Sequence, residues 1–152
     1  MRTVTVAWEP GADRFVAAGT SPGHLVVVGA PRSEETRRAA PEATGFSATE
    51  LLLAGAGACA AWDVVEILRK GRAALTGLEV RVEGQQGPEP PWEYRRVTLH
   101  VRVTGKGIEL KAAERAASLA IERYCSVLAT MRGICSIDWR VSVEEESAEP
   151  AA

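Results

Sequence analysis

The feature that most constrains the fold is an uncharged stretch, LLLAGAGACAAW, which runs from Leu51 to Trp62. Ser47 and Glu50 precede it with the S-x-x-E spacing of a capping box, which predicts the start of a helix. Lys70 is a basic residue suited to a last helical turn, and Gly71 directly after it predicts the end of the helix. The sequence therefore predicts one long helix that begins at the capping box and ends at Lys70.

Between Leu51 and Trp62 this helix is apolar on every side, which is typical of a helix buried all round rather than lying on a surface. Its alanines and glycines would let neighbouring backbones approach closely. A chain of 152 residues has little material with which to cover such a helix completely. We therefore expect a homodimer that wraps the helix between two sheets.

Alternation of apolar and polar residues with a period of two predicts strands before and after this helix. The expected strands cover residues 3–8, 14–19, 24–30, 78–84, 95–105 and 136–144. A second helix is predicted over residues 109–125, continued by a short helical turn that ends at Gly133. The order βββ-α-ββ-α-β indicates an α+β fold, with antiparallel sheets around the long buried helix. His100 lies on the polar side of its strand, where we expect it to be exposed.

Composition narrows the class of protein. With 46% hydrophobic and 25% charged residues, the chain is close to the globular average, and we expect one domain over residues 1–145 and an acidic, disordered tail over 146–152. A net charge of −2 argues against a nucleic-acid partner, because phosphate binding needs a basic surface. The uncharged run ends at Asp63, short of the roughly 20 residues that span a bilayer, and the N-terminus shows no apolar signal segment. We expect a soluble, cytoplasmic protein without a membrane partner.

Three cysteines, Cys59, Cys125 and Cys135, are the candidate reactive groups. Their odd count without C-x-x-C spacing does not indicate a disulfide framework, and two histidines without clustered ligands argue against a zinc site. Taken singly, each cysteine is explained as a small buried hydrophobe, since free cysteine is among the most buried residue types. Cys135 precedes a strand, and we expect it to be structural.

Cys125 lies at a break between two helical runs, ERYC and SVLATM. If it begins the second run, unpaired backbone N–H groups there would stabilise its thiolate. Thiols on two helices can meet in space although they are far apart in sequence. Such a pair suits peroxide chemistry, in which one thiolate attacks a peroxide oxygen and the other thiol captures the resulting sulfenic acid as a disulfide. From the residues alone, packing and chemistry both stay open.

Two motifs resemble those of the OsmC/Ohr family, and most closely its OsmC-like, YhfA-like branch. The first is TELLLAGAGACAAWDVVEILRKGR, residues 49–72, and the second is ERYCSV, residues 122–127. The stretch GHLVVVG near the N-terminus is also similar to that branch. The resemblance covers residues 3–145, which is nearly the whole chain, and the two motifs together are specific.

The resemblance implies an OsmC-like fold in an intertwined homodimer. It also implies reduction of organic hydroperoxides and, to a lesser degree, hydrogen peroxide. Cys59 would be the peroxidatic cysteine and Cys125 the resolving cysteine. An external dithiol would supply the electrons, with no metal and no bound organic cofactor.

The family also uses a glutamate and an arginine to lower the thiol pKa and to orient the peroxide. Glu50 matches the glutamate of the first motif, but nine positions separate it from Cys59, which is about 180° around a straight helix. A direct contact between them within one helix is therefore not expected, and the capping box explains Glu50 equally well. For the arginine, Arg37 and Arg38 are candidates, in a loop that could fold over a partner's site.

A second hypothesis is a dimeric module of the same fold that binds a small apolar ligand or senses oxidation without turnover. The reactivity of Cys59 separates the two, because a thiol pKa well below about 8.5 favours catalysis. Asp63 lies one turn after Cys59 on the predicted helix. We expect its carboxylate to find an arginine or backbone N–H partner and so to support the site.

Overall fold

The computed structural model describes residues 3–9, 14–19, 25–29 and 46–146. The chain divides into two compact units, residues 1–52 and 53–152. Arg37 and Arg38 lie outside the described residues, as does nearly all of the predicted tail, residues 147–152.

The N-terminal unit contains a three-stranded antiparallel sheet in the order β1-β2-β3. Its strands are β1 (Val4–Glu9), β2 (Arg14–Gly19) and β3 (Leu25–Gly29), close to the predicted ranges. Val4 and Val6 point to one face of β1 and are 64% and 60% exposed. This sheet therefore carries an apolar strip that the described residues do not cover.

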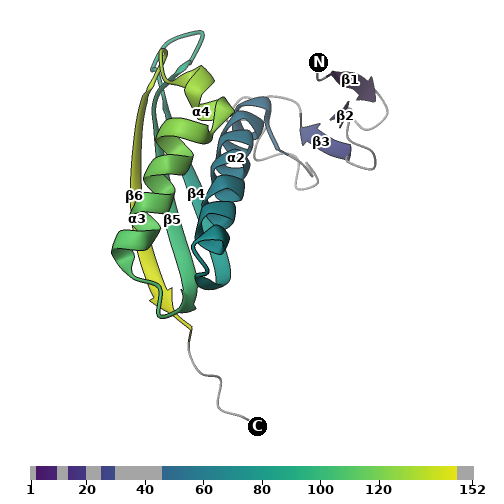
Figure 1. Cartoon of the computed structure of the whole chain (residues 1–152). Helices are drawn as coiled ribbons and strands as arrows, with labels where there is room; N and C mark the ends of the chain where they lie inside the picture. The colour runs from purple at the N-terminus through teal and green to yellow at the C-terminus, as the bar shows by residue number, and fades with distance from the viewer. Residues whose placement is uncertain (1–2, 10–13, 20–24, 30–45, 147–152) are drawn as a thin grey trace. The chain divides into compact units, whose positions relative to one another are not determined.

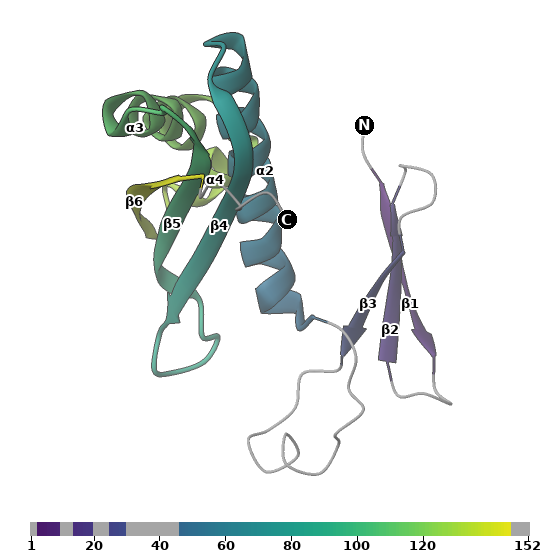
Figure 2. The same ribbon diagram turned by 90° about the horizontal axis from the view of Figure 1, so that it is seen from below.

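The C-terminal unit packs helices against one face of a second three-stranded sheet (Figures 1 and 2). The sheet has the order β4-β5-β6, with β4 (Ala74–Gln86), β5 (Tyr94–Lys106) and β6 (Ser136–Glu145). The helices are α2 (Ala48–Lys70) and a second segment made of α3 (Leu110–Ser118), the π-helix η2 (Leu119–Tyr124) and α4 (Ser126–Met131). The order of elements and the α+β class agree with the prediction.

The pairing of β5 with β6 differs from the prediction of antiparallel sheets. β4 and β5 are antiparallel, but β5 and β6 are parallel, with Val97 opposite Ile137 and Val101 opposite Val141. A parallel pair needs a crossover of a dozen or more residues, which is usually helical. The segment α3–η2–α4 provides that crossover, so β6 starts at the same end of the sheet as β5.

One side of β5 forms the centre of the core. Val97, Leu99, Val101 and Val103 are at most 1% exposed, which confirms the predicted inward face. The part of α2 in the core is a stripe of residues at intervals of four: Ala56, Ala60, Val64 and Leu68. Residues at that spacing lie on one side of a helix.

In a single chain α2 is not buried on every side, as expected for a chain with little material to cover it, and burial in a dimer stays a prediction. Leu52 is 45% exposed and Trp62 is 73% exposed, because one sheet and one helical segment cover only one side of α2. Gly57 marks a close approach of the helix to β4, since a Cβ there would lie 2.8 Å from Val82 Cγ2. Small residues therefore do bring the helix close to the sheet, as predicted.

The N-terminal end of α2 is closed by the predicted capping box. The backbone N–H of Ser47 donates to Glu50 Oε2 at 2.8 Å, and the backbone N–H of Glu50 donates to Ser47 Oγ at 3.2 Å. Each residue thus satisfies one otherwise unpaired donor of the other. The capping interpretation of Glu50 is confirmed.

The C-terminal end of α2 departs from the prediction in one detail. The N–H of Ala73 donates to the Leu68 carbonyl at 3.0 Å and the N–H of Arg72 to the Arg69 carbonyl at 2.9 Å, which is the Schellman pattern. The residue with left-handed backbone is Arg72, with φ of 58°, rather than Gly71. Gly71 therefore lies one position before Arg72, the position whose left-handed backbone would favour a glycine.

By length and composition α2 is apolar enough to cross a membrane. The uncharged run does end at Asp63, but the helix continues to Lys70, so the expectation drawn from the run alone is corrected. A single helix of this kind is weak support for a membrane span, because core helices of soluble proteins pass the same test.

Candidate active site

Cys59 lies at the edge of the buried stripe of α2. Ala56 and Ala60, on the core side of the helix, are fully buried, whereas Cys59 is half-buried and packs against the core with part of its surface. Its position therefore combines a fixed backbone with access from outside.

Cys125 occupies the break between η2 and α4. It is 1% exposed and has an extended backbone, with φ of −65° and ψ of 106°. Its sulfur accepts a hydrogen bond from the Leu128 N–H at 3.4 Å, and its thiol faces the carbonyl oxygen of Ala56 at 4.0 Å. Because Ala56 is one turn before Cys59, this contact places the buried thiol against the same region of α2.

The two thiols meet in a small group of hydrogen-bonding atoms. Cys59 Sγ lies 4.0 Å from Ser126 Oγ, and the Cys59 and Cys125 thiols are close enough to shift each other's pKa. The backbone N–H groups of Ser126 and Val127 also interact with the sulfur of Cys59. One thiol, one hydroxyl and two backbone N–H groups therefore surround this sulfur.

These donors make Cys59 the more acidic thiol. Burial is the largest single influence and by itself raises the pKa of Cys59. Hydrogen bonds from the Cys125 thiol, the Val127 N–H and Ser126 outweigh burial, so the pKa lies below its usual value. All of these donors are uncharged, so the lowering does not depend on an arginine beside the sulfur.

The pKa of Cys125 is shifted in the opposite direction. Its pKa is raised to about 11, chiefly by burial and in part by the hydrogen bond and charge of Cys59, although the Leu128 N–H lowers it. Of the two thiols, Cys59 therefore ionises first as the pH rises, and Cys125 keeps its proton to higher pH.

This order of ionisation corrects the prediction for the helical break. Cys125 does begin α4, and the Leu128 and Val127 N–H groups do lower its pKa, but burial outweighs them and the net pKa is raised. The N–H groups of Ser126 and Val127 also lower the pKa of Cys59, which is less buried.

Residues 41–140 match the family model of the OsmC-like protein. The chain belongs to the OsmC family. Protein YhfA of Escherichia coli (strain K12) is 41% identical over 81 residues, which are 53% of this chain and only 60% of YhfA. A hypothetical protein from Aquifex aeolicus VF5 has a TM-score of 0.80 at 24% identity, covering 97% of this chain and 98% of its own. An organic hydroperoxide resistance protein from Elizabethkingia anophelis has a TM-score of 0.68 at 15% identity, covering 95% and 96%. The last two likenesses show the fold.

The other catalytic candidates of this OsmC-family chain are not brought to the thiols by any described contact. Glu50 lies in the first turn of α2, where it completes the capping box. Its catalytic role stays a prediction. Arg37 and Arg38 lie outside the described residues, so their role also stays a prediction.

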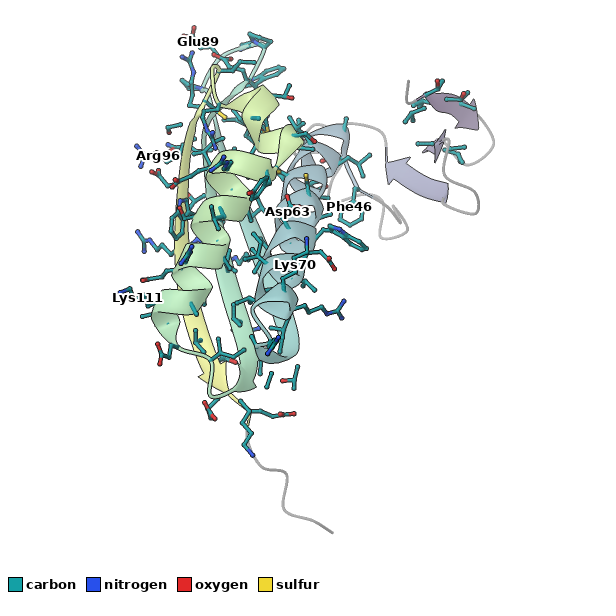
Figure 3. The ribbon with its side chains drawn as sticks, in the orientation of Figure 1. Phe46, Asp63, Lys70, Glu89, Arg96 and Lys111 are labelled. Carbon is teal, nitrogen blue, oxygen red and sulfur yellow. The ribbon has the colours of Figure 1, made fainter. Side chains whose placement is uncertain are left out.

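Cys135 and Asp63 are accounted for separately. Cys135 is half-buried, packs against the core and lies 3.7 Å from the Met131 carbonyl oxygen, which fits the expected structural role. Asp63, one turn after Cys59 on α2 (Figure 3), is half-buried and has no hydrogen-bond or ion-pair partner among the described residues. The support that we expected from Asp63 is therefore not found.

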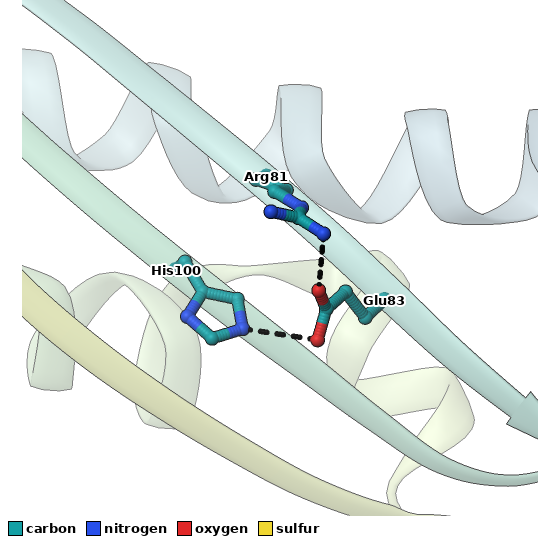
Figure 4. A network of polar contacts seen from close by, with 3 residues as sticks. All are labelled: Arg81, Glu83 and His100. Atoms are coloured by element: carbon teal, nitrogen blue, oxygen red, sulfur yellow. Dashed lines mark hydrogen bonds and ion pairs between the residues drawn. The ribbon is translucent and has the colours of Figure 1, made fainter.

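The outer face of the second sheet carries a polar network that is separate from the thiols (Figure 4). His100 Nε2 lies 3.2 Å from Glu83 Oε2, and Arg81 Nη2 lies 2.7 Å from Glu83 Oε1. The His100 side chain is 37% exposed, so it sits on the polar side as predicted. Within the described ranges, no group of three or more His, Cys, Asp and Glu residues could hold a metal ion.

The site residue that the sequence interpretation missed is Ser126. Its hydroxyl and its backbone N–H both contribute to the lowered pKa of Cys59. The available signal was its place directly after Cys125, at the first position of the helix that follows the break. Which sulfur it would face depended on the packing of α4 against α2, which the sequence does not state.

Proposed function

We propose that this OsmC-family protein is a thiol peroxidase that reduces organic hydroperoxides, and to a lesser degree hydrogen peroxide, in oxidative-stress defence. The observation that carries the proposal is the pairing of a half-buried Cys59, whose pKa is lowered, with a buried Cys125, whose pKa is raised to about 11. In a two-cysteine cycle the more acidic and more accessible thiol attacks the peroxide, and a second thiol close to it captures the sulfenic acid.

In the proposed cycle the Cys59 thiolate attacks the distal oxygen of the peroxide. The O–O bond breaks, Cys59 becomes a sulfenic acid, and the alkoxide leaves as an alcohol after taking up one proton. The Cys125 thiol gives up its proton and attacks the Cys59 sulfur, so that a disulfide forms and the sulfenic hydroxyl leaves with that proton as water. An external dithiol reduces the disulfide, restores both thiols and is itself oxidised to a disulfide.

Two observations support an organic substrate. Solved structures that share this fold include organic hydroperoxide resistance proteins, among them the Elizabethkingia anophelis protein. In addition, Trp62 lies one turn after Cys59 on α2 and is 73% exposed, and it would offer an apolar surface to an alkyl group near the sulfur. Glu50, Arg37 and Arg38 remain the proposed residues that tune the site.

We also propose that the protein acts as a homodimer in the cytoplasm, without a bound cofactor. Exposed apolar side chains on both units, among them Val6, Leu52 and Trp62, would be covered in such a dimer. Three free cysteines suit a reducing compartment, where a dithiol donor is also available.

Peroxide consumption with dithiothreitol as the donor tests the activity. We expect Cys59→Ser to lose at least roughly a hundredfold in kcat/KM for cumene hydroperoxide, because a hydroxyl does not form the nucleophile at neutral pH. Cys125→Ser should consume about one peroxide per Cys59 and then recycle poorly. Cys135→Ser is the matched control and should match the wild type. Full activity in Cys59→Ser would end the proposal.

A further inference from the structure

The widened turn η2 leaves two backbone carbonyls without partners along the helix. In a π-helix the N–H of residue i+5 donates to the carbonyl of residue i, and the Cys125 N–H makes such a bond to Ala120 at 2.8 Å. The next two bonds in this series would run from Ser126 to Ile121 and from Val127 to Glu122. They are not formed, because the extended backbone of Cys125 turns the chain out of the helix.

Arg132 supplies the missing donors. It lies directly after α4, and its side chain returns to η2, where Nη2 donates to the Ile121 carbonyl and Nη1 to the Glu122 carbonyl, both at 2.7 Å. One planar guanidinium thus satisfies two successive carbonyls, a task that suits its forked geometry. A buried carbonyl is costly when unpaired, and Ile121 is 1% exposed, so the contact with its carbonyl stabilises the break.

The N–H groups of Ser126 and Val127, which would have donated to those two carbonyls, can interact with other acceptors. No backbone carbonyl among the described residues accepts a hydrogen bond from the N–H of Ser126 or Val127. The Ser126 side chain contacts Cys59 Sγ at 4.0 Å, and both N–H groups help to lower the pKa of Cys59. The Val127 N–H also lowers the pKa of Cys125, so the groups that Arg132 replaces in η2 are donors of the thiol pair, and both of them act on Cys59.

We propose that Arg132 is a positioning residue for the thiol site: it takes the place of two backbone amides in η2 and so leaves them for the sulfur of Cys59. The inference deepens the proposed function and rests on it for its effect on turnover. Arg132 does not touch the sulfur in this arrangement. It acts through the backbone of Ser126 and Val127.

The side chain of Glu122 holds η2 in the same arrangement. Its carboxylate accepts from Trp139 Nε1 at 3.1 Å and from Ser118 Oγ at 3.2 Å, which ties η2 to β6 and to the end of α3. The Glu122 carbonyl is thereby kept where Arg132 reaches it. Arg132 joins this anchored turn to the end of α4, so the amides between them have little freedom to turn back to the carbonyls.

The pH dependence of Cys59 alkylation by iodoacetamide tests the inference in the full chain, in a Cys135→Ser background. In Arg132→Met the carbonyls of Ile121 and Glu122 lose their donors and recapture the two amides. The midpoint of the alkylation profile should then move to higher pH, with roughly tenfold slower alkylation at pH 6. Arg132→Lys restores a donor without the planar fork and should show a smaller shift in the same direction.

Arg115→Met is the matched control, because Arg115 is an exposed arginine of α3 whose side chain has no partner among the described residues. It should leave the profile unchanged. A folded Arg132→Met protein with the wild-type profile would overturn the inference. If Arg132→Met does not fold, Arg132→Lys decides: a shifted midpoint supports the inference and an unchanged one overturns it.

Alkylation needs no peroxide, so the positioning role of Arg132 and the peroxidase activity can be refuted independently of each other. A shifted profile in Arg132→Met together with no peroxide turnover in the wild type would refute the peroxidase and keep the positioning role. Normal peroxide turnover in the wild type together with an unshifted alkylation profile in Arg132→Met would keep the peroxidase and refute the positioning role.

Discussion

The helix α2 and the α3–η2–α4 segment present their cysteines in opposite ways. α2 is unbroken over 23 residues, is capped at both ends and carries Cys59 on a regular turn. The second segment widens into a π-helix and stops at Cys125 before α4 begins. The regular helix fixes where the reacting sulfur lies, and the irregular one leaves donors unpaired beside it. The acidity of Cys59 is therefore set by the neighbouring segment and not by its own helix.

The largest expected effect is the difference in alkylation rate between the thiols of Cys59 and Cys125. The pKa of Cys125 is raised to about 11 and that of Cys59 is lowered from its ordinary value, so at pH 7 the thiolate fraction of Cys59 exceeds that of Cys125 by about a hundredfold or more. Alkylation of Cys59 should slow only as the pH falls through its lowered pKa, whereas Cys125 should stay unreactive until the solution is strongly alkaline. Peptide mass spectrometry after timed iodoacetamide treatment measures both rates. Equal rates in the folded protein would remove the contrast.

A pair of glycines in α2 tests how closely the regular helix must approach the sheet. At Gly57 a Cβ would lie 2.8 Å from a methyl group of Val82, and Val82 is stiff at χ1, so Gly57→Ala should lower the free energy of unfolding by about 1–2 kcal/mol. Gly55 has nothing within 4 Å of the same atom, so Gly55→Ala should raise it by about 0.5–1 kcal/mol. Urea titration measures both, and effects of the same sign would contradict the packing.

The start of α2 offers a way to separate capping from chemistry at Glu50. Glu50→Ala removes half of the capping box and should cost about 1 kcal/mol of unfolding free energy. Glu50→Gln keeps an oxygen for the Ser47 N–H and should cost much less. A loss of unfolding free energy in Glu50→Gln as large as that in Glu50→Ala would argue against the capping box. A fall in kcat/KM in Glu50→Gln at unchanged stability would reveal the proposed catalytic carboxylate.

The smallest expected effect on stability is at Arg72, just after the C-terminal end of α2. Arg72 has φ of 58°, a backbone that costs an L-residue about 1–2 kcal/mol, and glycine there removes that cost but adds flexibility to the unfolded chain. Arg72→Gly should therefore stabilise the protein by a net of about 0.5 kcal/mol, seen as a higher thermal midpoint. A lower midpoint would mean that the arginine side chain contributes more than its backbone costs.

Much of the fold could be predicted because it depends on neighbours in sequence. The capping box of Ser47 and Glu50, the inward face of β5 and the break at Cys125 follow from local spacing. The parallel pairing of β6 did not, since strand direction depends on how far the crossover carries the chain. The sequence also indicated that a single chain could not cover α2 completely, but apolar composition alone does not show which side of the helix stays exposed.

The two cysteines of the candidate site were predictable from the sequence, but the groups that lower the pKa of Cys59 were not. Both cysteines were singled out, yet the sequence suggested that the break would acidify Cys125. Deciding which sulfur receives the N–H groups of Ser126 and Val127 requires knowing how α4 meets α2. Arg132 was not found for the same reason, since its partners, the Ile121 and Glu122 carbonyls, become unpaired only when η2 forms.

Cys125 has two tasks that compete in the proposed cycle. Its sulfur accepts the Leu128 N–H at the start of α4, and the same sulfur would close the disulfide with Cys59. Oxidation would draw it toward α2 and weaken the cap, so the reduced protein would keep an interaction that the oxidised protein loses. Extra stability of the dithiol form raises the reduction potential of a disulfide. The cap at α4 would thus make the oxidised protein an easier target for an ordinary dithiol donor and favour the resting enzyme in its reduced, ready state.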